Sequence, residues 1–545
     1  MVLSSFIKRG LYEHYLPIPR ECCSCPALLH YFATLGESMP IRKVAATTLF
    51  LAAMILNVVA AKVLGGKGKS GPKKAGTFIR RFLSSVNGSL SYVPKAGDQE
   101  YKAVLSDMFR AVKNPSRHSV GTSGPTSNED LFRARKKFFQ DIVEKGGAFD
   151  SDNTTVIHVA GSKGKGSVVE YIGAALRKDH KVGIFTSPHL HTARERIKVG
   201  SELISRADLT YFGKESLRIL SDYPWSVFFD LFLTTAILYF DAKKPEYIIL
   251  ETGIGGRFDS TNFVEKPKVG IITSVSLDHQ NVLGETLDLI AWQKAGIIKP
   301  GMAVFTPSTQ ARVVMDVIEK QCNEVGATLH VVPVSKSESV GTGITPLYEI
   351  EIQNLCLAQA VLSSLKVDAE GMKDFFWPCR MEKFEVRGST IILDGCHNGD
   401  SMKLFLEGAR KLYPRGHLRV LFGAGIEKSI DDMLLQVYTH ADSVVYLQSG
   451  HFKAASEQEL AGAMNSAGYD VAMPLGCAPL DKVEGGTVER RLKEILNAPD
   501  STPADKRPVY VVCGSLFAAA EARSALFALN PSLFRPDDWA GQSDF

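Results

Sequence analysis

A glycine-rich turn that follows an apolar strand is the feature that most constrains the fold of this chain. The segment Val156–Ser167 reads VIHVAGSKGKGS. Gly161, Gly164 and Gly166 allow backbone N–H groups to approach phosphate oxygens. The helix expected next, over Ser167–Arg177, adds its positive N-terminus. The pattern therefore predicts a nucleotide-binding turn between a buried strand and a helix.

The lysine and the serine of this turn suggest two further roles. We expect Lys165 to neutralise the β and γ phosphates of a nucleoside triphosphate and Ser167 to ligate Mg²⁺. The spacing departs from the Walker A pattern, because Val159 stands in place of its first glycine and Gly166 separates the lysine from the serine. An ordinary glycine-rich turn remains the alternative interpretation of this segment taken alone.

Composition indicates a globular protein with more than one domain. The chain has 545 residues, of which 45% are hydrophobic and 22% charged, so we expect two packed domains with additional segments. A net charge of +4 argues against a nucleic-acid binder and favours small-molecule chemistry. The nine cysteines lack paired metal-ligand spacing, which indicates a reducing compartment without a disulfide framework.

The first 97 residues differ in kind from the rest and are predicted to be a leader. Met1–Lys95 holds thirteen Lys and Arg against three acidic residues, and Val44–Ala61 is an uncharged run of 18. Three interpretations stay open: a membrane anchor, the apolar part of a cleaved organellar leader, and a helix packed on the body. The corresponding locations are a mitochondrion or plastid, a membrane with the body facing the cytoplasm, or the cytoplasm if the leader is unused. Gly65–Gly76 is expected to be a flexible linker.

From Asp98 onward, short β-rich runs alternate with helical stretches, which predicts α/β architecture with mainly parallel sheets. We place a central domain over 98–368 and a C-terminal domain over 369–545. The expected helices include Leu231–Phe240, Leu287–Ala295 and Leu355–Leu365. The expected strands are Thr154–Val159, Lys181–Phe185, Tyr247–Leu250, Val269–Val275, Ala303–Phe305, Thr390–Leu393, Leu418–Phe422, Ser443–Leu447 and Val509–Val512.

Polar residues follow several of these strands directly. Glu251 comes after one, Asp278 and His279 after a second, and Asp394 and His397 after a third. Ligands of open α/β sheets bind at the carboxyl ends of the strands, so the glycine-rich turn, Glu251 and His279 are expected to meet around one Mg·ATP. Each residue alone would more often be a surface carboxylate or a hydrogen-bonded loop histidine.

Five segments, in this order, resemble the signatures of the folylpolyglutamate synthase and dihydrofolate synthase family of the Mur ligase superfamily. They are HVAGSKGKGS, SPHLHTARERIKVGSELIS, LETGIGGRFDSTN, SLDHQNVLGETLDLIAWQKAGIIKPG and LDGCHN. The resemblance covers roughly Tyr101 to the C-terminus. It implies a Mur-ligase-like P-loop ATPase domain followed by a smaller Rossmann-like domain.

The resemblance also implies a reaction. Such enzymes use ATP to phosphorylate a folate carboxylate, and the amine of L-glutamate then attacks the acyl phosphate. ATP and Mg²⁺ at two sites are the implied cofactors, with room for a monovalent cation. By this resemblance Ser167 and Glu251 hold the first metal, His279 holds a second, and Lys294 matches a lysine that many relatives carry as a carbamate. An unmodified lysine that contacts phosphate is the alternative for Lys294.

Further site residues come from the same resemblance. Ser187, Pro188, His189, Arg194 and Arg196 match a mobile loop over the pterin and ATP sites, although ordinary salt bridging would also explain the arginines. Asn354, Arg380, Asp394 and His397 match positions that meet the nucleotide and the transferred phosphate across a cleft between the domains.

The sequence says less about which amide is formed than about the chemistry that forms it. We favour glutamate addition to tetrahydrofolate, with dihydrofolate synthase or a bifunctional enzyme as the alternative. An inactive membrane-tethered nucleotide-binding scaffold is a remote alternative from another class of protein. The expected partners are folate and L-glutamate, and a monomer is expected because two domains of one chain complete the site.

Overall fold

The computed structural model describes residues 97–111, 128–147, 149, 153–223, 225–334, 349–426, 430–450, 454–466, 488–497, 508–536, 538–542 and 544. The apolar run Val44–Ala61 and the linker Gly65–Gly76 lie outside these residues, so the leader remains a prediction. Within the described ranges, every helix is too short or too polar to cross a membrane.

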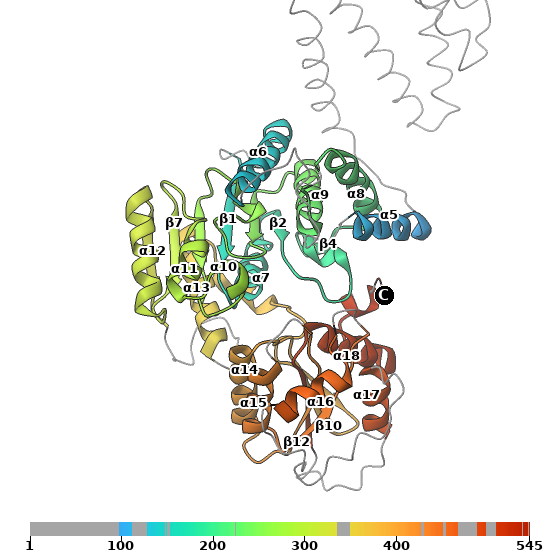
Figure 1. The fold of residues 1–545 in the computed structure, drawn as a ribbon. Coiled ribbons are helices and arrows are strands. Elements are labelled where there is room, and N and C mark those ends of the chain that lie inside the picture. The colour runs from blue at the N-terminus through green and yellow to red at the C-terminus, as the bar shows by residue number, and fades with distance from the viewer. Residues whose placement is uncertain are drawn as a thin grey trace, which may run out of the picture. The chain divides into compact units, whose positions relative to one another are not determined.

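Eight strands form the larger sheet, in the order β4-β3-β2-β5-β1-β6-β7-β8 (Figure 1). The six strands from β2 to β8 in this order are parallel, and β3 and β4 add an antiparallel edge. The strands are β1 (Thr155–Ala160), β2 (Val182–Phe185), β3 (Ile197–Val199), β4 (Glu202–Leu203), β5 (Tyr247–Glu251), β6 (Val269–Ile272), β7 (Ala303–Pro307) and β8 (Thr328–Val332).

Helices cover both faces of this sheet, which is why its central strands are apolar throughout. Successive residues of β1 alternate between the two cores: Ile157 and Val159 pack in one, and Val156 packs in the other. The first core lies under α7 (Lys165–Leu176) and α13 (Glu349–Leu365). Helices of the opposite face are α5 (Asp98–Arg110), α6 (Asn128–Gly146), α8 (Arg206–Leu220), α9 (Phe228–Lys243), α11 (Leu287–Ala295) and α12 (Arg312–Val325).

A second sheet of five strands follows, in the order β12-β11-β13-β10-β9. Only β9 is antiparallel to its neighbour. The strands are β9 (Glu382–Val386), β10 (Ser389–Leu393), β11 (Leu418–Phe422), β12 (Ser443–Tyr446) and β13 (Val509–Cys513). One face carries α14 (Gly399–Leu412), α15 (Ile430–His440) and α16 (Glu457–Ser466), and the other carries α17 (Val488–Asn497) and α18 (Leu516–Leu529).

The predicted α/β class with mainly parallel sheets is confirmed, whereas several boundaries differ. Helix α7 begins at Lys165 rather than Ser167, because Gly164 adopts a left-handed conformation at the N-cap. Strand β5 extends to include Glu251, and β6 already ends at Ile272. Strands β3, β4, β8 and β9 were not predicted, since they are short or partly exposed.

The predicted domain ranges 98–368 and 369–545 remain predictions. Contacts join Pro94–Phe545 into one unit. The short helix η4 (Ala369–Asp374) follows the proposed boundary, yet its Met372 is buried in the core beneath α7.

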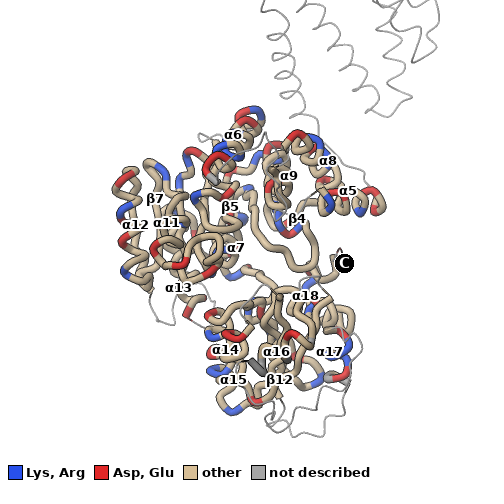
Figure 2. The backbone as a smooth tube through the Cα atoms, in the orientation of Figure 1, with Lys and Arg blue, Asp and Glu red and all other residues tan. Residues whose placement is uncertain are grey.

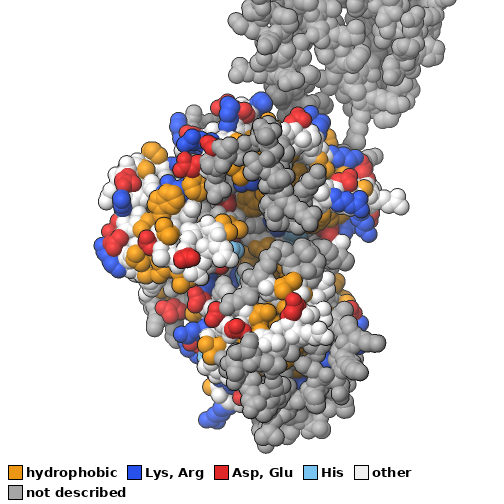
Figure 3. Space-filling model, in the orientation of Figure 1, with side chains coloured by type: hydrophobic (Ala, Val, Ile, Leu, Met, Phe, Trp, Pro, Cys, Tyr) orange, Lys and Arg blue, Asp and Glu red, His pale blue; other side chains and the backbone are white. Residues whose placement is uncertain are grey.

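The surface in view carries mixed charges and one apolar area. Figure 2 shows Lys and Arg interspersed with Asp and Glu along the helices. Figure 3 shows hydrophobic side chains gathered over the α11 and α12 side of the larger sheet. Leu289, Trp292 and Val313 are the large hydrophobic side chains of these two helices that are exposed.

Candidate active site

A cavity lies where the carboxyl ends of the two sheets face each other. Loops that follow β1, β2, β5 and β6 line one side, and the segment that precedes β9 and the loop that follows β10 line the other. Of the predicted site residues, those that line this cavity are Gly164, Lys165, Gly166, Ser187, Pro188, Glu251, Arg380 and His397. One cavity therefore combines residues from both sheets.

The glycine-rich turn is packed too tightly for any side chain larger than hydrogen. A Cβ at Gly161 would collide with Thr273, and one at Gly164 would collide with the amide of Asn354. Gly164 also has φ of 86°, a region that glycine enters without strain. Asn354 itself is buried, and its Oδ1 has no hydrogen-bond partner among the residues that the structure describes. The predicted Asn354 thus lies directly against the glycine-rich turn.

Two lysines converge on the turn. Lys165 Nζ donates to the carbonyl oxygen of Gly161 at 3.2 Å, and Lys294 Nζ donates to the same oxygen at 2.8 Å. Burial, assisted by the positive charge of Lys165, lowers the pKa of Lys294 to about 7. A substantial share of the Lys294 amine is therefore neutral near physiological pH, which is the form that reacts with CO₂.

Glu251 and Ser167 supply buried oxygen atoms beside these lysines. Both side chains are buried, and the Glu251 carboxylate accepts a hydrogen bond from the backbone N–H of Ser187 at 2.9 Å. Burial raises the pKa of Glu251, and the charge of Lys165 opposes that rise. A bound cation would favour the charged form of this carboxylate.

The donor set at this end of the sheet fits a magnesium ion that is shared with phosphates. Among the described residues, His, Cys, Asp and Glu form no cluster of three that could hold a metal alone. Mg²⁺ usually takes only one or two protein carboxylates and completes its shell with water and phosphate oxygens. Glu251 and Asp278 both line the cavity. His279 lies outside its lining, with Nε2 at 3.9 Å from Asp278 Oδ2, so its second-metal role remains a prediction.

The second sheet contributes a buried carboxylate and a histidine. Asp394 accepts hydrogen bonds from the N–H groups of Met381 and Cys396, each at 2.9 Å, and Arg380 lies 3.9 Å from it. Burial raises the pKa of Asp394, and Arg380 opposes the rise. His397 donates from Nδ1 to the carbonyl of Gly395 at 2.9 Å, so neutral His397 carries its proton on Nδ1.

The loop Ser187–Arg196 divides into two parts. Ser187 and Pro188 line the cavity, whereas His189, Arg194 and Arg196 do not. Arg196 donates from Nε to His189 Nδ1 at 2.8 Å and lies over the ring of Phe228. Arg194 donates from Nε to the carbonyl of Ile204 at 2.7 Å. In this conformation both arginines form hydrogen bonds that hold the loop, and their contact with substrate remains a prediction.

Lys163 and Trp377 are cavity residues that the sequence did not single out. Lys163 forms an ion pair with Asp400 of α14 at 3.4 Å, which joins the turn to the second sheet. Trp377 packs on Gly166, where a Cβ would come within 2.5 Å of its ring. The SKGKGS segment contains two lysines, and this was a signal for Lys163. No sequence signal pointed to Trp377, because tryptophan in a connecting segment is usually a packing residue.

Comparisons with known proteins agree with this arrangement. Residues 379–515 match the family described as Mur ligase, glutamate ligase domain. A dihydrofolate synthase/folylpolyglutamate synthase of Bacillus subtilis is 30% identical over 340 residues, which is 56% of this chain and 78% of that protein. The folylpolyglutamate synthase of Neurospora crassa is 30% identical over 47% of this chain and 54% of its own length. Two other eukaryotic relatives are covered over 43% and 60% of their lengths.

Solved structures share the fold. The Mycobacterium tuberculosis folylpolyglutamate synthase complexed with ADP has a TM-score of 0.64 and 21% identity, over 78% of this chain and 98% of that one. A bifunctional folylpolyglutamate synthase/dihydrofolate synthase from Yersinia pestis, complexed with AMPPNP and Mn ion, has a TM-score of 0.62 and 21% identity, with the same coverage.

Proposed function

Because the chain belongs to the folylpolyglutamate synthase/dihydrofolate synthase family, we propose that it uses ATP to join L-glutamate to folates through an acyl phosphate. One observation carries this proposal: Lys165, Glu251, Arg380 and His397 come from two sheets and line a single cavity. Nucleotide binding alone would need only the first sheet.

The chemistry requires charge neutralisation and alignment. In the first step an oxygen of the folate carboxylate attacks the γ-phosphorus, and the bond to the ADP oxygen breaks. Lys165 would neutralise the phosphates from the first sheet, and Arg380 would do so from the second. The amine of glutamate then attacks the acyl carbon, loses a proton and releases phosphate. His397 at the cavity wall would accept that proton at Nε2. Closure of both sides around the cavity would exclude water from the acyl phosphate.

A divalent cation would be held by Ser167 and Glu251 together with phosphate oxygens. It would supply charge for the phosphoryl group and orient it. The lowered pKa of Lys294 supports a further proposal, namely that its amine forms a carbamate with CO₂ and so supplies an additional oxygen ligand. Carbon-13 NMR of protein equilibrated with labelled bicarbonate should show a carbamate signal that is lost in Lys294→Met. A spectrum identical to that of the variant would leave Lys294 as a phosphate-contacting amine.

The substrate distinguishes the favoured reaction from the alternative. The full chain would be given Mg·ATP and labelled glutamate with either tetrahydrofolate or dihydropteroate, and the products identified by mass spectrometry. Successive glutamate additions to tetrahydrofolate alone are expected. A single addition to dihydropteroate would indicate dihydrofolate synthase, and both products a bifunctional enzyme. The absence of product from either substrate, with ATP still bound, would contradict the proposal.

The leader and the oligomeric state are separate proposals. We propose that residues 1–97 direct the body to an organelle or a membrane, on the basis of the basic composition and the apolar run Val44–Ala61. Imaging of the full chain beside a chain that starts at Asp98 tests this, since an unchanged distribution would contradict it. A monomer is proposed because one chain supplies both walls of the cavity, and light scattering would measure it.

A further inference from the structure

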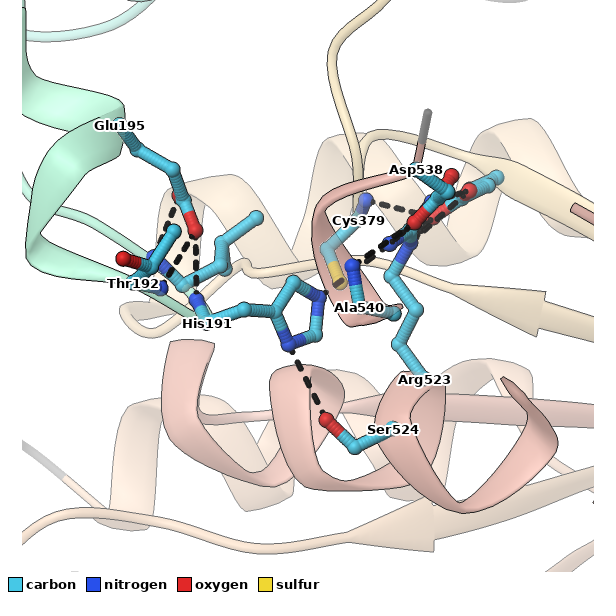
Figure 4. A network of polar contacts seen from close by, with 10 residues as sticks. His191, Thr192, Glu195, Cys379, Arg523, Ser524, Asp538 and Ala540 are labelled. Carbon is cyan, nitrogen blue, oxygen red and sulfur yellow. Dashed lines mark hydrogen bonds and ion pairs between the residues drawn. The ribbon is translucent and has the colours of Figure 1, made fainter. Parts of the chain in front are cut away.

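The loop Ser187–Arg196 is anchored on a helix of the second sheet by a buried histidine, His191. His191 Nε2 lies 3.2 Å from Arg523 Nη1, and His191 Nδ1 lies 3.1 Å from Ser524 Oγ (Figure 4). Arginine can only donate, so Nε2 accepts and the proton resides on Nδ1, which donates to Ser524. Burial and the charge of Arg523 lower the pKa of His191 to about 3, in agreement with this neutral form. His191 therefore attaches the loop to helix α18.

Arg523 is itself fixed by two carboxylates. Its side chain is 0% exposed. It donates to Glu382 through Nε at 2.8 Å and Nη2 at 2.9 Å, and to Asp538 through Nη1 at 2.6 Å and Nη2 at 2.7 Å. Planar, charge-assisted pairs of this kind fix orientation as well as position. The Arg523 guanidinium is thus a rigid support for His191.

The C-terminal segment contacts the same loop through Asp544. The Asp544 carboxylate accepts from Thr192 Oγ1 at 2.6 Å, from the N–H of Ala193 at 3.0 Å and from the hydroxyl of Tyr101 at 2.7 Å. Its backbone N–H donates to the carbonyl of His191 at 3.0 Å. A residue next to the end of the chain therefore ties the loop to helix α5.

These contacts continue into the cavity. The Glu195 carboxylate accepts from the N–H groups of Leu190, His191 and Thr192 at 2.7 to 2.8 Å, which shapes the loop into a turn. Leu190 and Glu195 line the cavity (the turn is visible in Figure 4). At the start of the loop, the N–H of Ser187 donates to Glu251. A shift of His191 would move residues that face the substrate.

We propose that His191, Arg523 and Asp544 are positioning residues, which hold the Ser187–Arg196 loop in the conformation that receives the carboxylate-bearing substrate. The inference rests on the proposed function for the identity of that substrate. It assigns no contact with the reacting atoms to these three residues. Their effect passes through Leu190 and Glu195, which line the cavity, whereas the glycine-rich turn before α7 is packed against Thr273, Asn354 and Trp377.

The test compares Asp544→Ala with Glu489→Gln, a control that removes an exposed carboxylate from α17. For Asp544→Ala we expect the KM for tetrahydrofolate to rise about tenfold, because small misplacements of substrate contacts have large effects. The Kd for ATP should stay within about twofold. Asp544→Glu should restore part of the loss. A purely structural role would lower the melting temperature and leave the ratio of the two constants unchanged, which would overturn the proposal.

A second readout does not depend on the folate. Limited trypsin digestion of the full chain should cleave after Arg194 or Arg196 several times faster in Asp544→Ala than in the parent chain. Faster cleavage in a protein that makes no folate product would overturn the proposed function and retain the anchored loop. Equal cleavage together with an unchanged KM would overturn the anchor. His191→Gln provides the second variant should Asp544→Ala fold poorly.

Discussion

At the scale of single residues, the ionisation of Lys294 is the most consequential feature. Its pKa falls from 10.5 to about 7 because the amine is buried and lies near Lys165. Between these two values the unfolded chain binds more protons than the folded chain, so the free energy of unfolding should increase with pH. Below about pH 7 both states are protonated and the full cost of the buried charge remains.

Lys294→Met removes this titration and should be the less pH-dependent protein. We expect the stability of the parent relative to Lys294→Met to rise by about 1 kcal/mol per pH unit between pH 7 and 9. Urea denaturation at each pH, in buffer free of CO₂ and of divalent ions, measures the difference. A flat difference over this range would show that Lys294 is charged in the folded state.

At the scale of elements, the junction between β1 and α7 depends on a glycine with no room around it. In Gly164→Ala, strain from the positive φ would add to a collision with Asn354. We expect ATP affinity to fall at least about tenfold and the free energy of unfolding to drop by about 1 to 3 kcal/mol. Isothermal titration and urea denaturation give the two values.

Gly200→Ala, in the turn between β3 and β4, is the matched control for Gly164→Ala. Gly200 has φ of 65°, and a Cβ there meets nothing within 4 Å, so the substitution introduces strain without a collision. It should lower stability by about 1 kcal/mol and leave ATP affinity unchanged. Equal losses of ATP affinity in both variants would mean that the collision with Asn354 has no part in shaping the turn.

At the scale of the whole molecule, the phosphate-binding turn is joined to the second sheet through Trp377 and through the pair of Lys163 with Asp400. The ion pair is partly exposed and contributes little stability by itself. Trp377 is the better reporter, because it packs on Gly166. Mg·ATP should change the intrinsic fluorescence, and Trp377→Phe should remove most of that change.

Trp292→Phe provides the comparison, because Trp292 is exposed on α11 and stacks with Arg257 at 4.0 Å. The ATP-dependent signal should survive in this variant. A signal that disappears in Trp292→Phe and persists in Trp377→Phe would contradict the role of the junction between the sheets.

Local sequence patterns predicted the parts of the fold that local physics determines. The glycine-rich turn, the buried parallel strands and α11 at Leu287–Ala295 follow from hydrophobic runs and turn residues. Strands β3 and β4 are too short for such a signal; β3 pairs with the edge of β2, and β4 pairs with β3.

From local pattern alone, the candidate site was predictable at the glycine-rich turn and where polar residues follow a strand. Glu251, Asp394 and His397 do so, and the fold brings them to the facing edges of the two sheets. His191 and Asp544 were not predicted. His191 lies 332 residues from Arg523 in the chain, and Asp544 lies 352 residues from Thr192, and no local pattern encodes such pairs. The assignment of Arg194 and Arg196 to substrate stays a prediction; in this structure they donate to Ile204 and His189 within and next to the loop.

Transfer of a labelled oxygen tests the central claim most directly. Tetrahydrofolate with heavy oxygen in its terminal carboxylate would be incubated with the full chain, Mg·ATP and L-glutamate, and the released phosphate analysed by mass spectrometry. An acyl phosphate requires one labelled oxygen to appear in phosphate for the first glutamate added to each labelled folate, with no transfer in Lys165→Ala. Amide formation that leaves the phosphate unlabelled would contradict the account.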